Sequence, residues 1–255
     1  MTLEGKTVLI TGAGAGLGRG MALAAAGAAA HVFVTSLSEN GRATAAEITE
    51  RGGTATWLAC DVSDRRAVDF AVAEAVRITG RLDGMIHNAF ARPRWEEPGA
   101  RSVAELPLSL WEHEVSVSLR GAYYCAQAAF PHLVATKGRL ILLTSGGGIE
   151  GSGDKPSYGA CKGAIRALTK SLAREWGPLG VTVNAVSPFA NSLSFEQGWK
   201  ENPDAKAAQE RLTALRYLGE GEQDVAPPVV FLLSDASHYV TGQTLMTDGG
   251  RYLAL

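Results

Sequence analysis

The sequence predicts an α/β fold, a single doubly wound domain over residues 1–255 with a mainly parallel seven-stranded sheet. Short apolar runs rich in β-branched residues recur along the chain, and they do not alternate cleanly between polar and apolar positions. Such runs are typical of parallel strands that helices cover on both faces. Helical stretches separate the runs, and no Pro/Gly/Ser-rich linker divides the chain. This alternation of strand and helix indicates one α/β domain.

The elements follow in order from these patterns. The expected strands span residues 6–10, 31–35, 55–59, 82–87, 138–144, 181–186 and 244–248. The expected helices span residues 17–26, 42–51, 64–79, 110–135, 158–176 and 205–215. Segments 90–109 and 189–204 fit neither pattern and leave strands at the edge where open α/β sheets bind ligands. They are either pocket walls or ordinary surface loops.

Composition and charge exclude several classes of partner. The net charge of -2 and a pI near 6.2 provide no basic field for nucleic acid or an anionic membrane surface. No apolar run approaches the roughly 20 residues of a membrane span. The three cysteines lack metal or redox spacing, and the five histidines are scattered, so no metal site is expected. The first residues, MTLEGKTVLITG, lack the features of a signal peptide. We expect a cytoplasmic protein with a small-molecule ligand.

The stretch TGAGAGLG, residues 11–18, lies between the first strand and an alanine-rich helix. The pyrophosphate of a dinucleotide must approach backbone N–H groups at a helix start, where the helix dipole favours negative charge. A side chain at Gly12 or Gly16 would block that approach, and one at Gly18 would push helix from strand. A tight turn without a ligand is the alternative, but the position favours a nucleotide site. The expected contacts are Gly12, Ala15, Gly16, Leu17 and Gly18.

Nucleotide preference is expected about 20 residues beyond the glycines, where an acidic residue would bind the ribose 2′-OH and exclude a 2′-phosphate. Counting from Gly16, this position is Ser36, and no carboxylate is there. No basic residue stands at Ala15 or Leu37, although Arg42 is close in sequence. The cofactor is therefore NAD or NADP, with a slight preference for NADP.

Tyr158 and Lys162 stand four residues apart at the start of a predicted helix, on the same helix face. A nearby ammonium stabilises a phenolate, so we expect Lys162 to lower the pKa of Tyr158 toward the working range. Ser145 ends the fifth strand and could hydrogen-bond the same substrate oxygen. Taken alone, this pair could be a chance exposed pair on a helix; beside the glycine turn it indicates acid–base chemistry.

At this point the chain resembles the short-chain dehydrogenase/reductases over nearly its whole length. The residues that carry the resemblance lie between the glycine turn and TGQTLMTDGG at 241–250, and they are Asp61, Val62, Asn88, Ala89, Ser145, Tyr158 and Lys162. The resemblance implies a Rossmann-type fold, a nicotinamide cofactor and commonly a homodimer or homotetramer. It also implies cofactor contacts: Asp61 and Val62 flanking the adenine, Asn88 and Ala89 along the cofactor, Lys162 on the nicotinamide ribose, and Pro188 and Asn191 after the sixth strand.

Three departures from the family's pattern fall on the site. The family's N-N-A-G appears as HNAF, which places Phe90 where glycine is usual. Its P-G pair appears as Pro188 and Phe189, and the threonine expected near Leu193 is absent. Its fourth active-site residue, an asparagine in V-N-L-x-G, is Ser118 in VSLRG. We expect a narrower pocket, and a proton path in which the Ser118 hydroxyl and an extra water replace the amide.

Two functions compete. The first is an NAD(P)-dependent oxidoreductase that interconverts a secondary alcohol and a carbonyl, with Ser145, Tyr158, Lys162 and Ser118 as its catalytic group. The second is a nucleotide-binding scaffold or regulator that has lost turnover, which Ser118 favours and the other three oppose. The substrate side is less defined, because its aromatic residues could equally be packing residues. Besides Ser145, the candidate substrate contacts are Phe90, Trp95, Phe189, Phe195 and Trp199.

Overall fold

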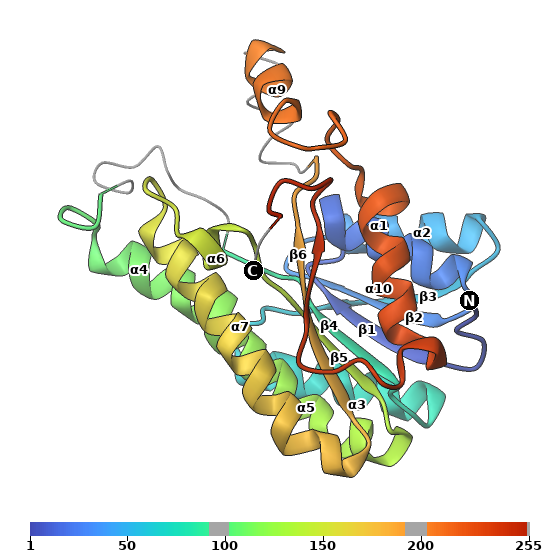
Figure 1. Ribbon diagram of the computed structural model, residues 1–255. Coiled ribbons are helices and arrows are strands. Elements are labelled where there is room, and N and C mark those ends of the chain that lie inside the picture. Colours follow the sequence, from blue (N-terminus) through green and yellow to red (C-terminus); the bar gives the residue numbers. More distant parts are fainter. Residues whose placement is uncertain (92–101, 192–202, 254–255) are drawn as a thin grey trace.

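A computed structural model describes residues 1–91, 102–191 and 203–253 (Figure 1). Within these ranges, seven strands form one sheet in the order β3-β2-β1-β4-β5-β6-β7, and all neighbouring pairs are parallel. The strands are β1 (Thr7–Thr11), β2 (His31–Ser36), β3 (Thr54–Ala59), β4 (Gly84–His87), β5 (Arg139–Leu143), β6 (Thr182–Pro188) and β7 (Thr244–Thr247). The predicted fold class is confirmed.

Helices cover both faces of this sheet (Figure 1). They are α1 (Gly16–Gly27), α2 (Asn40–Glu50), α3 (Arg65–Thr79), α4 (Leu108–Glu114), α5 (Gly121–Thr136), α6 (Gly147–Glu150), α7 (Pro156–Trp176), α9 (Pro203–Glu210) and α10 (Ala226–Leu233). Short 3₁₀ turns lie at Gly177–Leu179 and Asp235–Ser237, and wider π-helical turns at Val115–Arg120 and Gly221–Val225.

Two helix predictions differ from the structure, and two short helices, α6 and α10, were not predicted. The single helix expected over 110–135 is α4 and α5 joined by the π-turn η1 (Val115–Arg120). The helix expected over 205–215 ends at Glu210. Helix α10 was not predicted, because it has only eight residues and two prolines in its first turn. Proline fits there, since the first N–H groups of a helix have no partner within the helix.

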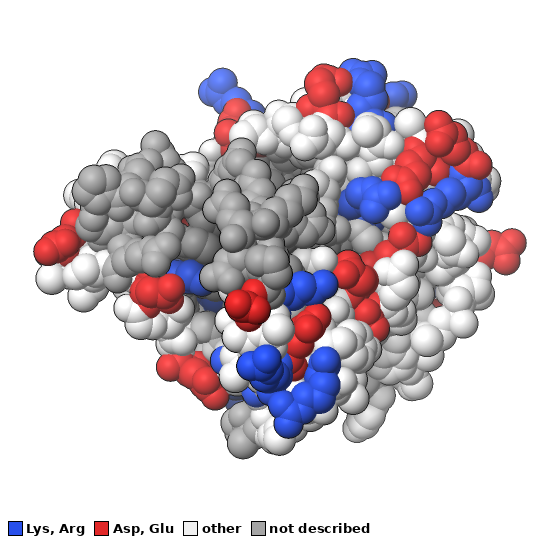
Figure 2. All heavy atoms as spheres, turned by 90° about the horizontal axis from the view of Figure 1, so that it is seen from above, with Lys and Arg blue, Asp and Glu red and all other residues white. Residues whose placement is uncertain are grey.

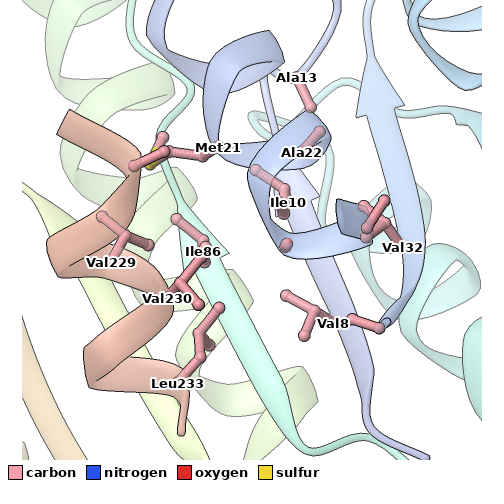
Figure 3. Close-up of a cluster of buried hydrophobic side chains, with 14 of the residues drawn as sticks. Val8, Ile10, Ala13, Met21, Ala22, Val32, Ile86, Val229, Val230 and Leu233 are labelled. Carbon is pink, nitrogen blue, oxygen red and sulfur yellow. The ribbon is translucent and has the colours of Figure 1, made fainter. Parts of the chain in front are cut away.

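Successive apolar residues of one strand pack into two separate hydrophobic cores, one on each face of the sheet. This explains why the strand sequences do not alternate between polar and apolar residues. On one face, Val8 and Ile10 of β1 pack against α1 and α10, and Figure 3 shows Met21 and Val230 among the side chains that meet there. On the other face, Leu9 belongs to the cluster formed with α3, α5 and α7. Because both sets of alternate positions are buried, every position of the strand favours an apolar or compact side chain.

The strand order reverses direction between β1 and β4, so the turns that follow these two strands are neighbours. The Asn88 side-chain amide donates hydrogen bonds to the carbonyl oxygens of Thr11 at 3.1 Å and Gly12 at 3.0 Å. A Cβ atom on Gly18 would lie 2.2 Å from the Gly12 oxygen and 2.5 Å from Asn88 Nδ2. The glycine turn, the start of α1 and the end of β4 are thus packed in direct contact.

We predict that Gly18→Ala lowers the free energy of unfolding by about 1–3 kcal/mol, as for other overpacked sites. Gly27→Ala is a matched control at the far end of α1, because Gly27 is exposed and a Cβ there meets nothing within 4 Å. It should leave stability unchanged or raise it, since alanine favours helix. Urea denaturation of both variants measures the difference. Equal stabilities would contradict the packing described for Gly18.

Candidate active site

Three side chains predicted to act together converge beyond the carboxyl end of β5. Ser145 follows that strand after one further residue, and Tyr158 and Lys162 lie one turn apart near the start of α7. The Ser145 side chain lies close enough to Tyr158 to lower the pKa of its hydroxyl, and the Lys162 ammonium lies 5.7 Å from the centroid of the Tyr158 ring. A substrate oxygen beside Tyr158 and Ser145 could therefore receive a hydrogen bond from each hydroxyl.

Lys162 is buried, with 4% of its surface exposed. Its Nζ donates a hydrogen bond to the Leu143 carbonyl oxygen at 2.8 Å, and Thr144 Oγ1 donates to the Lys162 carbonyl oxygen at 2.8 Å. These bonds attach the lysine to the end of β5. Burial lowers the Lys162 pKa to about 8, against an opposing effect of the Glu114 carboxylate. The ammonium can therefore exchange a proton close to neutral pH.

The predicted direction of the Tyr158 pKa is wrong. Burial raises the pKa of Tyr158 above its ordinary value; the nearby Ser145 hydroxyl opposes this, and the nearby Glu114 and Tyr252 side chains add to it. Sequence spacing correctly placed an ammonium near the phenol, but the loss of water around the hydroxyl outweighs that contact. Tyr158 is thus a protonated phenol at neutral pH.

Ser118 lies in the middle of η1, fully buried. Its hydroxyl donates a hydrogen bond to Glu114 Oε1 at 2.8 Å and accepts one from the Ala91 N–H at 3.3 Å. Its carbonyl oxygen accepts a hydrogen bond from His87 Nε2 at 3.1 Å. Sequence reasoning missed Glu114, although an acidic residue four positions before Ser118 in a predicted helix was a usable signal.

His87, the last residue of β4, acts here as a neutral hydrogen-bond donor. Because the Ser118 carbonyl can only accept, Nε2 carries the ring proton. The other ring nitrogen, Nδ1, then accepts and lies 3.3 Å from Thr11 Oγ1. Burial and the charge of Lys162 lower the His87 pKa to about 3. This histidine therefore holds the π-turn without contributing charge to the site.

The start of α1 fits a phosphate group. Ala15 at the N-cap offers no side-chain acceptor, and the first turn holds no acidic residue, so its N–H groups have no side-chain partner. Gly12 and Gly16 have φ values of +64° and +52°, which favour glycine. A Cβ at Gly12 would lie 2.9 Å from the Ala89 Cα. The predicted contacts at Leu17 and Gly18 lie in the first turn of the same helix.

The residues expected beside the adenosine are engaged with one another. The Ser36 hydroxyl accepts a hydrogen bond from Trp57 Nε1 at 3.0 Å and donates one to the Ser38 carbonyl at 2.6 Å. Arg42 stacks over the Trp57 ring at 4.4 Å and pairs with Glu39 at 2.7 Å. Leu37 is 78% exposed. The Arg42 guanidinium, rather than the Ser36 hydroxyl, is the group near the end of β2 whose charge suits a phosphate.

The two other predicted adenine contacts differ in exposure. Asp61 is exposed, and its carboxylate accepts hydrogen bonds from the Ser63 N–H and hydroxyl at 2.9 Å and 2.7 Å. Val62 is buried and faces Gly121, where a Cβ would lie 3.0 Å from it. Asp61 therefore closes the turn after β3, while Val62 anchors that turn to α5.

The residues predicted near the substrate divide between described and undescribed segments. Phe90 is 43% exposed, and its ring centroid lies 5.8 Å from Lys162 Nζ. Phe189 follows Pro188, the last residue of β6, and its ring lies 5.5 Å from the Arg251 guanidinium. Asn191 donates a hydrogen bond to Glu220 Oε1 at 3.1 Å. Trp95, Phe195 and Trp199 lie outside the described residues.

Tyr252 is a site residue that sequence reasoning missed. A Cβ on Gly146 would lie 2.0 Å from the Tyr252 ring, so the ring rests on the backbone beside Ser145. The buried Asp248 carboxylate accepts hydrogen bonds from the N–H groups of Gly250 at 2.9 Å and Tyr252 at 3.0 Å, which turns the chain back after β7. A cavity of about 400 Å³ lies beside this turn and includes Phe189 in its lining.

Other kinds of site find no support in the described ranges. No group of His, Cys, Asp and Glu in them could hold a metal ion. None of the helices described is long and apolar enough to cross a membrane. Figure 2 shows acidic and basic side chains interspersed on the face seen from above, without a continuous basic area.

Known proteins are similar to this chain over nearly its whole length. The family model described as enoyl-(acyl carrier protein) reductase matches residues 12–251. The chain is 34% identical to the (2S)-[(R)-hydroxy(phenyl)methyl]succinyl-CoA dehydrogenase subunit BbsD of Thauera aromatica, with 99% of each chain covered. It is also 34% identical to L-rhamnose 1-dehydrogenase (NAD(P)(+)) of a Sphingomonas species, with 99% of this chain and 98% of the relative covered.

A solved structure agrees with the sequence relatives. The structure of a short-chain type dehydrogenase/reductase from Mycobacterium ulcerans superimposes with a TM-score of 0.91 at 25% identity, covering 99% of this chain and 92% of the other. The family match spans nearly the whole chain and includes the glycine turn, Ser145, Tyr158 and Lys162. The chain belongs to the short-chain dehydrogenase/reductase family.

Proposed function

We propose that this protein interconverts a secondary alcohol and a ketone or related carbonyl compound, using NAD or NADP. The observation that carries the proposal is the convergence of Ser145, Tyr158 and Lys162 beyond β5 in a chain whose first helix start fits a phosphate. A bound nicotinamide would supply or accept the hydride at the carbon of the substrate. Gly12, Gly16 and the first turn of α1 would hold its pyrophosphate.

Tyr158 is the proposed acid in carbonyl reduction and the proposed base in alcohol oxidation. Because its pKa is raised by burial, the phenol is protonated at neutral pH and ready to donate to a carbonyl oxygen. Ser145 would hold the same oxygen through its hydroxyl. The ground state of the site therefore suits reduction, and oxidation requires the phenol to lose its proton first.

Lys162 has two proposed tasks. Its buried ammonium, fixed by the Leu143 carbonyl, would hydrogen-bond the nicotinamide ribose, and its charge would stabilise the phenolate that forms on Tyr158 during reduction. A pKa lowered to about 8 by burial places its own proton exchange close to neutral pH. Lysine suits this position, because its pKa responds readily to burial.

The names of the relatives support an alcohol or carbonyl substrate and do not define which one. One relative is named for an acyl-CoA with a hydroxyl group and the other for a sugar. The rings of Phe90, Phe189 and Tyr252 lie on the substrate side of the site and would favour a substrate with an apolar or aromatic part. We propose these three rings as walls of the pocket on its substrate side, because they contact Lys162, Arg251 and the backbone of Gly146 respectively.

The competing function is a nucleotide-binding scaffold without turnover. Ser118, in place of the family's asparagine, favours it. The presence of Ser145 and Tyr158 beside the buried Lys162 opposes it, since a scaffold that only binds the nucleotide would need the lysine for the ribose but not the two hydroxyls for a substrate oxygen. Spectrophotometric screening of secondary alcohols and ketones with both nucleotides separates the two functions, because a scaffold binds the nucleotide and leaves its oxidation state unchanged.

We predict that Tyr158→Phe lowers kcat by about 10²-fold or more, as expected when a general acid is removed. Nucleotide affinity should stay close to that of the parent, because the glycine turn is untouched. Tyr239→Phe removes the same hydroxyl at a position that is 95% exposed and should leave both quantities unchanged. Steady-state kinetics and fluorescence titration measure them. Near-normal turnover by Tyr158→Phe would exclude Tyr158 as the acid.

We propose that Arg42 gives the slight preference for NADP over NAD, with Glu39 weakening it by pairing with the guanidinium. Arg42→Ala is predicted to weaken binding of NADPH more than that of NADH, and Glu39→Gln to strengthen NADPH binding, because it frees the cation. Arg77→Ala and Glu74→Gln are the control, since these residues form an ion pair with the same three-residue spacing on α3. Dissociation constants for both nucleotides test this. Equal effects on both would place Arg42 away from the 2′ position.

We also propose a homodimer or homotetramer formed through α5 and α7, and a cytoplasmic location. These helices lie side by side on one face of the sheet (Figure 1), where the Phe130 and Trp176 rings pack at 4.8 Å. Ala167 is exposed on α7, so Ala167→Arg is predicted to shift the sedimentation coefficient toward the monomer. Ala46→Arg, on α2, should not. A monomeric parent protein would refute this assembly.

A further inference from the structure

Glu114 is a buried acid that the proposed reaction leaves unexplained. It is the last residue of α4, and only 8% of its surface is exposed. An acidic side chain is rarely buried to this degree unless it is paired or hydrogen-bonded. Helix α4 packs against α7, the helix that carries Tyr158 and Lys162. The carboxyl therefore lies at the interface between its own helix and the proposed catalytic one.

The orientation of this carboxyl is determined by Ser118. The serine hydroxyl has one proton, and it donates that proton to Glu114 Oε1 at 2.8 Å. The Ala91 N–H and His87 Nε2 fix the same serine through its hydroxyl oxygen and its carbonyl. Because Ser118 is held from two other directions, its hydroxyl cannot turn away without breaking a second bond. Ser118 thus acts as a support for Glu114.

The surroundings of Glu114 contain few charges that could compete with it. On α7 the groups within its electrostatic reach include Lys162, which is the cation, and the neutral side chains of Tyr158 and Cys161. His113 neighbours it on α4, and the uncharged His87 stands behind Ser118. The Tyr252 phenol faces Tyr158 from the chain after β7. Ser118 is thus the hydrogen-bond partner of the carboxylate, and Lys162 is the cation whose charge acts most strongly on it.

We infer that Glu114 is a positioning residue of the active site, whose charge, held in place by Ser118, keeps Lys162 and Tyr158 protonated together. The inference deepens the proposed function and rests on it for its catalytic meaning. A carboxylate favours the ammonium of Lys162 and disfavours the phenolate of Tyr158, so its effects on the two proton equilibria have the same sign. Removing the charge should make both groups lose their protons at lower pH.

The electrostatics agree with this geometry. The Glu114 carboxylate raises the pKa of Lys162 against the dominant lowering by burial, and it adds to the raising of the pKa of Tyr158. Burial raises the pKa of Glu114 itself, while the hydrogen bond from Ser118 and the charge of Lys162 lower it. The Glu114 charge therefore acts on both groups, and its removal should appear in the titration of Lys162 and of Tyr158.

The first experiment needs no turnover. Protein labelled with ¹³C at tyrosine Cζ is titrated by NMR, and the Tyr158 signal is assigned by its absence in Tyr158→Phe. Glu114→Gln removes the charge but keeps the shape and an oxygen that can accept from Ser118. We expect its Tyr158 midpoint at lower pH than in the parent. Glu112→Gln, an exposed acid on the same helix, should leave the midpoint unchanged. An unchanged midpoint in Glu114→Gln overturns the inference.

The second experiment follows the rate against pH in both directions. Carbonyl reduction consumes a protonated Tyr158, so Glu114→Gln should lose reductase activity at lower pH than the parent does. Alcohol oxidation needs the phenolate, so the same variant should gain activity at lower pH. Glu114→Asp keeps the charge and should return both profiles toward the parent. If Glu114→Gln does not fold, the neutral Glu114→Met takes its place.

The outcomes separate the inference from the proposed function. If the parent protein is active and Glu114→Gln does not shift its pH–rate profiles, the proposed role of Glu114 is overturned. The oxidoreductase function then stands. A parent without turnover on any alcohol or carbonyl, with a Tyr158 midpoint that Glu114→Gln lowers, refutes the proposed function and retains the electrostatic coupling. Parallel shifts in the NMR titration and in both rate profiles support the two together.

Discussion

The junction between the ends of β1 and β4 is the constraint on which the rest of the site depends. Thr11 Oγ1 accepts hydrogen bonds from the N–H groups of Asn88 and Ala89, and the Asn88 amide returns two bonds to the glycine turn. These bonds join two strands at the point where the order of the sheet reverses. They place the start of α1 beside the segment from Asn88 to Phe90. The helix start proposed to hold the pyrophosphate therefore lies next to the segment whose Phe90 ring contacts Lys162.

Burial, more than pairwise contact, determines the chemistry of the polar residues. Desolvation lowers the pKa of Lys162 and of His87 and raises that of Tyr158 and of Glu114, in each case as the largest effect. The pKa values of Glu114 and Lys162 therefore move toward each other, while that of Tyr158 moves upward, away from that of Lys162. A surface cluster of the same composition would be screened by water and would not be coupled in this way.

Periodicity and motif spacing were sufficient for the sheet, most of the helices and the trio around Tyr158, because these depend on local pattern and on strand order. They were not sufficient for Glu114 or Tyr252. In sequence Glu114 is one more charge on a helix, and its burial follows from the packing of α4 on α7 and on the π-turn that carries Ser118. Tyr252 reaches Ser145 through a turn held by Asp248, a contact between distant parts of the chain. The direction of the pKa shift of Tyr158 depends on its burial, and the spacing of residues in the sequence gives no information about burial.

The tight packing of the glycine turn constrains which residues can change during the evolution of chains with this fold. At Gly12 and Gly18 protein atoms already occupy the space a side chain would need, so the requirement to fold is enough to preserve both glycines. A descendant that had abandoned catalysis would keep the turn for the sake of its own sheet. The Tyr158 hydroxyl and the Glu114 carboxyl take no part in the hydrogen bonds that join this turn to β4, so the packing of the turn would not preserve them. Gly12 and Gly18 are therefore expected in any chain with this fold, whereas Tyr158 and Glu114 are expected only where catalysis is still under selection.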